Sequence, residues 1–310
     1  MTSTIKQISV IGLGTIGMRW ATVFTHFGFD VCAQDPDAQA WNHYQHERGK
    51  LAKELQQLHP IHTQPGTIRF TTDIDVAVAN ADFIQENAPE NLGLKRQLMQ
   101  QIGHAAPAHA LIASSSSAFA VSDFQAECPQ AERIVLGHPF NPAHLMPLVE
   151  VVGGQHTRQE TVDAAVQFYE RIGKKPVVLQ RELPGHLALR LMGAMWREAI
   201  ALVLEGSVSV KDIDRAFQYG PGPKWTLQGS FISNALGAES MEDFLQKYSQ
   251  TYHDIWQDLR ATPDLHDINT RTAIIDGTQA AAQPQTRQEI QEARDAGLIE
   301  LLGIQQKYNT

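Results

Sequence analysis

Three polar elements in the middle of the chain have the residue types that the oxidation of an alcohol requires. They are a run of serines at 114–117, a histidine at 138 and a glutamate at 150. A hydride leaves a carbinol carbon only when a base takes the hydroxyl proton, and a histidine held in one tautomer by a carboxylate is the usual base. His138 with Glu150 can supply that pair, and a serine hydroxyl can hold the substrate oxygen. We therefore expect a catalytic site where the fold brings these elements together.

Near the start of the chain, three glycines recur at short spacing between an expected strand and an expected helix. The segment reads Gly12-Leu13-Gly14-Thr15-Ile16-Gly17. Gly12 permits a tight turn, Gly14 lets the backbone approach a pyrophosphate, and Gly17 lets helix and strand pack closely. The helix N-terminus at Thr15 and Ile16 meets the negative charge of the phosphates. Because strand and helix flank the glycines, we expect this loop to bind a dinucleotide.

The residue that follows the second expected strand indicates which dinucleotide is bound. Asp35 stands near the spacing of about 20 residues past the last glycine at which a carboxylate binds the adenosine ribose. A carboxylate there repels a 2′-phosphate, and no arginine immediately follows Asp35. The sequence therefore favours NAD over NADP.

These residues need a sheet whose strands end together, and the first part of the chain has the pattern of one. From Ile5 to about Leu183, short β-rich runs alternate with amphipathic stretches, as in a parallel sheet with crossover helices. The expected strands are Ile8–Ile11, Asp30–Gln34, Ile68–Thr71, Asp82–Gln85, Ala110–Ser114, Ile134–Gly137, Leu148–Val152 and Pro176–Leu179. The polar segment Pro36–Leu58 is expected to form a surface helix. The fold class is α/β, a Rossmann-type doubly wound sheet whose carboxyl edge binds the ligands.

After Pro184-Gly185 the pattern changes, since no strands follow and long helical stretches begin. Among the expected helices are Leu187–Glu205, Val210–Gln218, Met241–Trp256 and Gln288–Ile304. We therefore expect an NAD-binding domain at 1–183 and an all-helical domain at 184–310 for substrate binding and dimerisation. A homodimer through the helical domain would bury its surplus apolar surface.

Composition excludes several other classes of protein. The net charge of -9 argues against a nucleic acid partner, and no apolar run approaches the roughly 18 residues of a membrane span. The 13 histidines fall into no metal-ligand spacing, so we expect no metal. The two cysteines lie far apart, and the first residues resemble no signal peptide. We expect an unprocessed cytoplasmic enzyme acting on a small molecule.

Three segments resemble the successive signatures of the 3-hydroxyacyl-CoA dehydrogenase family, and the similarity runs through both expected domains. They are Ala113-Ser-Ser-Ser-Ser, Gly137-His-Pro-Phe-Asn-Pro and Pro147-Leu-Val-Glu-Val. The resemblance implies that His138 is the general base, Glu150 its orienting partner and Ser117 the ligand of the substrate oxygen. It also assigns three residues to the ribose and nicotinamide side of the cofactor: Glu90, Lys95 and Asn141.

The helix expected to open the second domain departs from this family. Family members generally carry an Asn in a Gly-Phe-x-x-Asn-Arg pattern, whereas this chain reads Gly185-His186-Leu187-Ala188-Leu189-Arg190. Leu189 cannot hydrogen-bond a carbonyl. Either the polar contact comes from elsewhere, with His186 as a candidate, or the substrate sits differently. The departure favours a small free acid over an acyl-CoA.

Within the family, several segments are most similar to the carnitine 3-dehydrogenases. They are Ala81-Asp-Phe-Ile-Gln-Glu-Asn-Ala-Pro-Glu, the segment at His138, Met195-Trp-Arg-Glu-Ala and Lys224-Trp225. A trimethylammonium group cannot donate hydrogen bonds and is held best by aromatic faces. The aromatic candidates for the substrate site are Phe140, Trp196 and Trp225, with Tyr219 and Phe231 in segments that could face it. Arg190, Arg197 or Lys224 could bind the carboxylate.

Three alternatives stay open. A 3-hydroxyacyl-CoA dehydrogenase would need a basic cluster for the CoA phosphates, and Arg48, Lys50 and Lys53 are diluted by Glu47 and Glu54. An L-gulonate 3-dehydrogenase would need polar groups for a polyol rather than aromatic faces. A protein that binds NAD without catalysis would fit the loss of the Asn, but not the retention of the histidine, glutamate and serine.

Overall fold

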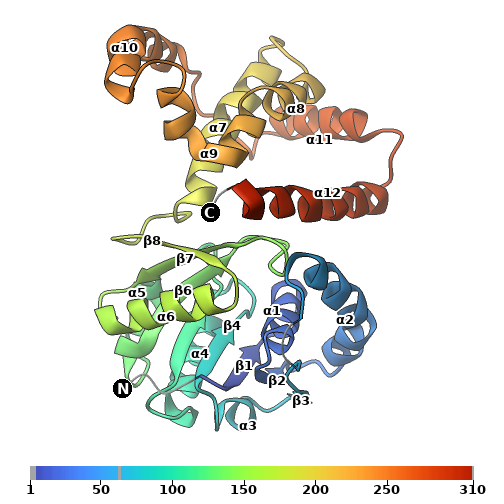
Figure 1. Cartoon of the computed structure of the whole chain (residues 1–310), viewed down its shortest axis with the longest axis vertical. Coiled ribbons are helices and arrows are strands. Elements are labelled where there is room, and N and C mark those ends of the chain that lie inside the picture. The colour runs from blue at the N-terminus through green and yellow to red at the C-terminus, as the bar shows by residue number, and fades with distance from the viewer. Residues whose placement is uncertain (1–4, 62–63, 309–310) are drawn as a thin grey trace. The chain divides into compact units, whose positions relative to one another are not determined.

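The computed structural model describes residues 5–61 and 64–308, which belong to two compact units divided between Arg190 and Leu191 (Figure 1). The first unit is an α/β domain and the second is helical. This confirms the expected fold class. The expected boundary at Leu183 stays a prediction.

The first unit is built on one sheet of eight strands in the order β3-β2-β1-β4-β5-β6-β7-β8. The strands are β1 Gln7–Ile11, β2 Asp30–Gln34, β3 Ile68–Thr71, β4 Phe83–Glu86, β5 Leu111–Ser114, β6 Ile134–Pro139, β7 Leu148–Gly153 and β8 Lys175–Val178. Each expected strand is present, and its ends agree with the expected ones to within two residues. The chain reverses its direction across the sheet after β3, which leaves the crevice between β1 and β4 for a ligand.

One pair of strands departs from the expected parallel sheet. β6 and β7 are antiparallel, whereas the other neighbouring pairs are parallel. The connection between them covers only residues 140–147. A parallel connection needs a crossover of about a dozen residues or more, so this one is too short. The sheet is therefore mostly parallel, with one antiparallel pair.

Helices cover both faces of the sheet. One apolar cluster joins the sheet to the helices α1 Thr15–His26, α2 Gln39–Leu58 and α6 Gln159–Arg171. A second cluster joins it to α3 Ile74–Val78, α4 Leu92–Ala105 and α5 Val121–Gln125. A short 3₁₀ helix, Ala131–Arg133, leads into β6. Alternate strand residues enter opposite clusters, since Val10 belongs to the first and Ile11 to the second.

The expected surface helix at 36–58 is confirmed as α2. It buries Tyr44, Leu51, Leu55 and Leu58 along one side and is otherwise mostly polar. These apolar residues repeat at helical spacing and form a narrow apolar stripe. The stripe packs α2 against the first apolar cluster of the sheet domain.

The second unit holds helices and no strand in its described part. They are α7 Ala188–Leu204, which begins in the first unit, α8 Val210–Tyr219, α9 Pro221–Ala235, α10 Met241–Asp258, α11 Ile268–Ala282 and α12 Arg287–Tyr308. α9 and α11 are not among the helices named from the sequence pattern. Gly229 interrupts α9 with a φ of 73°, and Gly277 lies within α11. In the part of the chain that the structure describes, no helix is long and apolar enough to cross a membrane.

Candidate active site

The glycine loop between β1 and α1 has the geometry of a phosphate-binding turn. Gly12 has a φ of 82°, and a Cβ there would lie 2.8 Å from the Asn87 carbonyl oxygen. A Cβ on Gly17 would collide with the Gly12 carbonyl, whereas a Cβ on Gly14 would meet no protein atom within 4 Å. Gly12 and Gly17 therefore serve the turn and the packing, and Gly14 leaves space for a ligand.

The N-terminus of α1 has no side-chain cap and no acidic residue in its first turn. The N–H groups of this turn attract an anion, and an uncapped N-terminus beside open space fits the pyrophosphate of a dinucleotide. Thr15 and Ile16 begin the helix at this point. Binding of the dinucleotide by this turn stays a prediction.

Asp35 lies beside this loop at the end of β2. One of its carboxylate oxygens accepts from the backbone N–H of Leu13 at 2.8 Å, and the other accepts from Asp37 N–H at 3.0 Å. The side chain is partly exposed. These bonds fix the Asp35 carboxylate next to the glycine turn, and its expected contact with the ribose stays a prediction.

The antiparallel pairing of β6 and β7 brings His138 and Glu150 together. The two residues are directly opposite in the register, so their side chains share one face of the sheet. His138 Nδ1 lies 2.8 Å from Glu150 Oε2. Because a carboxylate only accepts, Nδ1 carries the hydrogen and Nε2 is left with a lone pair. This is the arrangement that a histidine base requires.

Glu150 is fully buried and is also held by the beginning of α7. Its Oε1 accepts from the backbone N–H groups of Leu187 at 2.7 Å and Ala188 at 2.8 Å. Burial alone would raise the pKa of Glu150, but the hydrogen bonds from His138, Ala188 and Leu187 outweigh it and lower the pKa. Glu150 is therefore charged at neutral pH and fixes the tautomer of His138.

The serine run ends in a turn that Glu90 organises. Glu90 Oε1 accepts from both the N–H and the hydroxyl of Ser117, and Oε2 accepts from the Ser116 hydroxyl at 2.9 Å. Burial would raise the pKa of Glu90, but these bonds and the nearby charge of Lys95 lower it. Ser114 donates instead to Glu86. Ser117 is only partly buried, unlike Ser114 and Ser116, and its role as the ligand of the substrate oxygen stays a prediction.

Lys95 is buried beneath this turn. Its Nζ lies 3.0 Å from Oε1 and 3.2 Å from Oε2 of Glu86, 3.2 Å from the Ala88 carbonyl and 3.8 Å from Glu90. Sequence reasoning missed Glu86, although its place at the carboxyl end of β4 was a signal for it. In this structure Lys95 pairs with Glu86 and lies near Glu90, and its assignment to the cofactor stays a prediction.

His186 lies next to His138. The two ring centroids are 5.1 Å apart, and His186 Nε2 is 3.0 Å from the Ser116 carbonyl oxygen. Burial is the main cause that lowers the pKa of His186, and nearby His138 lowers it further. In the segment 185–190, which departs from the family pattern, His186 is thus a residue that contacts His138 and the serine turn.

The remaining predicted site residues fall into two groups. Phe140 lies edge-on to His138 with ring centroids 6.4 Å apart, and Asn141 is exposed just beyond it. Their loop is held by Lys174, whose Nζ donates to the Ala143 carbonyl at 2.6 Å. Trp196 and Trp225 belong to the second unit and are 52% and 40% exposed. Their assignment to the substrate site stays a prediction.

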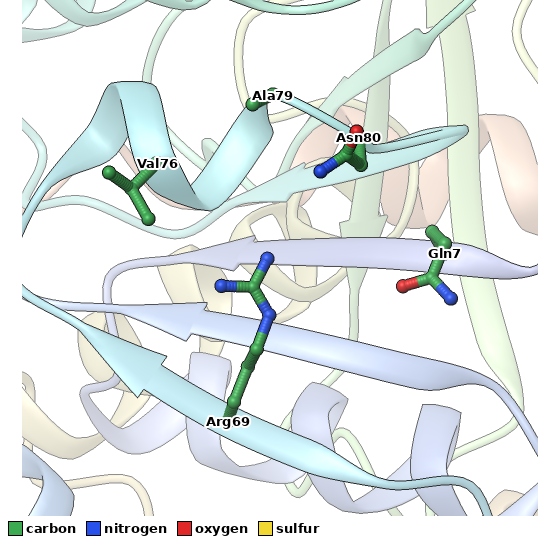
Figure 2. A pocket seen from close by; sticks show the side chains of 5 residues that line it. All are labelled: Gln7, Arg69, Val76, Ala79 and Asn80. Carbon is green, nitrogen blue, oxygen red and sulfur yellow. The ribbon is translucent and has the colours of Figure 1, made fainter.

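An open pocket of about 720 Å³ lies elsewhere on the first unit, beside α3. Figure 2 shows the residues that line it: Gln7, Arg69, Val76, Ala79 and Asn80. Gln7 begins β1, so the pocket is set apart from the carboxyl end of that strand, where the glycine turn lies. None of its residues belongs to the predicted site. Among the described residues, no group of three or more His, Cys, Asp or Glu side chains could hold a metal ion.

Comparison with known proteins places both units in one family. The family described as "3-hydroxyacyl-CoA dehydrogenase, NAD binding domain" matches residues 7–183, and "3-hydroxyacyl-CoA dehydrogenase, C-terminal domain" matches residues 185–268. L-carnitine dehydrogenase of Bacillus cereus is 37% identical over 99% of this chain and 94% of its own length. That of Burkholderia mallei is 37% identical over 96% and 93%.

A solved structure shares the whole fold. It is 5-formyl-3-hydroxy-2-methylpyridine 4-carboxylic acid 5-dehydrogenase, described as an NAD+-dependent dismutase. The TM-score is 0.87 at 27% identity, over 98% of this chain and 99% of that one. The similarity therefore includes the helical unit as well as the sheet domain.

Proposed function

This chain belongs to the 3-hydroxyacyl-CoA dehydrogenase family, and we propose that it oxidises the 3-hydroxyl of a small free acid, carnitine, to 3-dehydrocarnitine. The family resemblance expected from the sequence is confirmed, and so is NAD as the cofactor. The chain is thus an NAD-dependent dehydrogenase. The observation that carries the proposed chemistry is the bond of 2.8 Å between His138 and Glu150.

In the proposed reaction, His138 removes the proton of the substrate hydroxyl through Nε2. Bound NAD supplies the acceptor for the hydride. Glu150 keeps the proton of His138 on Nδ1 and stabilises the imidazolium that forms. Ser117 holds the substrate oxygen, after its hydroxyl turns from Glu90 toward that oxygen. The uncapped N-terminus of α1 and Asp35 hold the dinucleotide.

Several observations support a small free acid over an acyl-CoA. The family Asn is replaced by Leu189, which has no polar group for a thioester carbonyl. The basic residues on α2 are partly neutralised, since Lys50 lies 3.9 Å from Glu54. The curated relatives that match over nearly the whole chain are named L-carnitine dehydrogenases. Phe140 beside His138, with Trp196 and Trp225, would supply aromatic faces for the trimethylammonium group.

We also propose a cytoplasmic homodimer that forms through the second unit. Its helices α8, α9 and α10 have no buried residue, and large apolar side chains are exposed, among them Phe231 at 79% and Leu236 at 65%. An apolar surface of this kind is buried well by a second copy. Both cysteines are buried free thiols, which suits a reducing compartment.

A panel of substrates tests the proposed function. Purified protein with NAD is given L-carnitine, D-carnitine, L-gulonate or 3-hydroxybutyryl-CoA, and NADH absorbance is followed. We expect turnover with carnitine. Comparison of L-carnitine with D-carnitine shows which enantiomer is the substrate. Turnover of the CoA ester alone would contradict the proposal and support a 3-hydroxyacyl-CoA dehydrogenase. NAD binding without turnover of any acid would support the alternative that the protein is not catalytic.

A further inference from the structure

The peptide bond between Ser116 and Ser117 is held at both ends. Its N–H, on Ser117, donates to Glu90, and its carbonyl, on Ser116, accepts from His186 Nε2 at 3.0 Å. A peptide unit is planar, so fixing both polar ends fixes its orientation. That orientation sets the direction in which the Ser117 side chain leaves the backbone.

His186 adopts a left-handed backbone conformation, which residues other than glycine seldom adopt. Its φ is 52°, and among the described non-glycine residues only Gln130 shares a positive φ. The side chain is 3% exposed. A strained conformation of this kind persists where the surrounding contacts hold it and is often found at functional sites. The contact with the Ser116 carbonyl is one that holds it.

The same short segment also reaches the histidine and its carboxylate. The N–H groups of Leu187 and Ala188, which follow His186, donate to Glu150 Oε1. The His186 ring lies 5.1 Å from the His138 ring between centroids. Residues 186–188 therefore contact the serine turn through a side chain and Glu150 through the backbone.

We propose that His186 is a positioning residue that ties Ser117 to the His138–Glu150 pair, so that the serine hydroxyl and the base face one substrate oxygen. The inference rests on the roles of Ser117 and His138 in the proposed function. A carbonyl only accepts, so His186 carries its hydrogen on Nε2 and its Nδ1 is bare when the ring is neutral. Burial, which lowers the pKa of His186, favours the neutral ring.

Two substitutions at position 186 separate the hydrogen bond from the space that the ring fills. His186→Phe keeps an aromatic ring and loses the donor, and His186→Gln keeps an N–H at similar reach. Gln130 shows that glutamine adopts a positive φ in this chain. We expect kcat to fall by about 10–100-fold in His186→Phe, the range for loss of an orienting partner, and by less than about fivefold in His186→Gln. NADH affinity should change by less than about twofold in both.

The matched control is His43→Phe, the same substitution at an exposed residue of α2, which should behave as the wild type. Equal losses of kcat in His186→Phe and His186→Gln would overturn the proposal, since the donor would then be irrelevant. So would a wild-type kcat in His186→Phe.

A double-mutant cycle shows whether His186 acts through Ser117. In a Ser117→Ala background, His186→Phe should lower kcat by less than about twofold, because the hydroxyl that it positions is gone. The same loss in both backgrounds would contradict the proposal. If Ser117→Ala alone leaves kcat unchanged, the role of Ser117 in the proposed function fails, which is a different outcome.

A measurement without substrate keeps the inference separate from the choice of acid. Nitrogen-15 NMR of the NAD complex should show His186 as the neutral Nε2–H tautomer at pH 7. Hydrogen exchange of the Ser117 amide should become faster in His186→Phe and stay slow in His186→Gln. The opposite tautomer, or exchange that is unchanged in His186→Phe, would overturn the proposal even if carnitine is not the substrate.

Discussion

At the scale of single residues, the proposed reaction depends on which nitrogen of His138 is free. Glu150 accepts from Nδ1 and from two N–H groups at the start of α7, so it has both the charge and the fixed position to leave Nε2 as the base. Ser117 approaches from a different strand end and is oriented by Glu90. The proposed chemistry thus rests on a few hydrogen bonds that join β6, β7, the start of α7 and the turn after β5.

Replacement of the base tests this assignment. His138→Ala should lower kcat by about 10²–10⁴-fold, the usual contribution of general base catalysis, because it removes the nitrogen that takes the hydroxyl proton in the proposed reaction. NADH binding, followed by fluorescence, should be retained, since Gly14 and Asp35 are untouched. Turnover near the wild-type value would show that His138 is not the base.

The acid stability of the protein tests the charge of Glu150. Its pKa is lowered in the folded state, so its contribution to the free energy of unfolding is complete above the unfolded pKa of about 4.3 and is lost as pH falls through the folded value. Glu150→Gln removes this pH-dependent contribution to the free energy of unfolding. We expect the melting temperature of the wild type to fall more steeply below about pH 5 than that of Glu150→Gln.

The control for acid stability is Glu170→Gln at the exposed end of α6, which should keep the steep dependence of the wild type. Glu150→Gln should also be less stable at pH 7 by about 1–3 kcal/mol, because it weakens buried hydrogen bonds. Identical acid profiles for the wild type and Glu150→Gln would mean that the pKa of this carboxyl is not lowered by folding.

At the scale of elements, the β1–α1 unit divides the work of its glycines between folding and binding. Gly17 lies against the Gly12 carbonyl, and Gly14 faces open space. The helix N-terminus beside Gly14 has no side-chain cap of its own. Gly17 therefore allows the helix to pack on the strand, whereas Gly14 leaves the space that a phosphate would need.

A pair of alanine substitutions separates these two roles. Gly17→Ala should lower the free energy of unfolding by about 1–3 kcal/mol or more, because its Cβ meets backbone that must shift. Gly14→Ala should change stability by less than about 1 kcal/mol and weaken NADH binding about tenfold or more, since the methyl group fills the space for the pyrophosphate. Urea unfolding and fluorescence titration check the two effects. Equal stability of the two variants would contradict the division.

At the scale of the whole molecule, the two units differ in how much apolar surface they bury. The sheet domain has two apolar clusters, one on each face, whereas α8, α9 and α10 have no buried residue. Helices with so little burial are not stabilised well by their own packing. The proposed homodimer would supply the missing contacts.

Sedimentation velocity tests the dimer. We expect the wild type to sediment as a dimer and Phe231→Glu to dissociate at micromolar concentration, because a charge at an exposed apolar residue of α9 opposes burial. Gln228→Glu places the same charge at an exposed polar residue of that helix and should stay dimeric. A monomeric wild type would contradict the proposal. Dissociation of Gln228→Glu would show that charge alone, and not the apolar contact, controls assembly.

The sequence by itself determined the α/β class, the eight strands, the glycine loop with Asp35 and the family, because these follow from local patterns: residue spacing, apolar periodicity and short motifs. The tertiary structure decided what depends on pairing between distant segments. The antiparallel register of β6 and β7 places His138 opposite Glu150. Lys95 and Glu86 are buried together and form an ion pair, and the positive φ of His186 accompanies its contact with the Ser116 carbonyl. Register, burial and backbone strain arise from contacts across the fold, and no local pattern in the chain contains them.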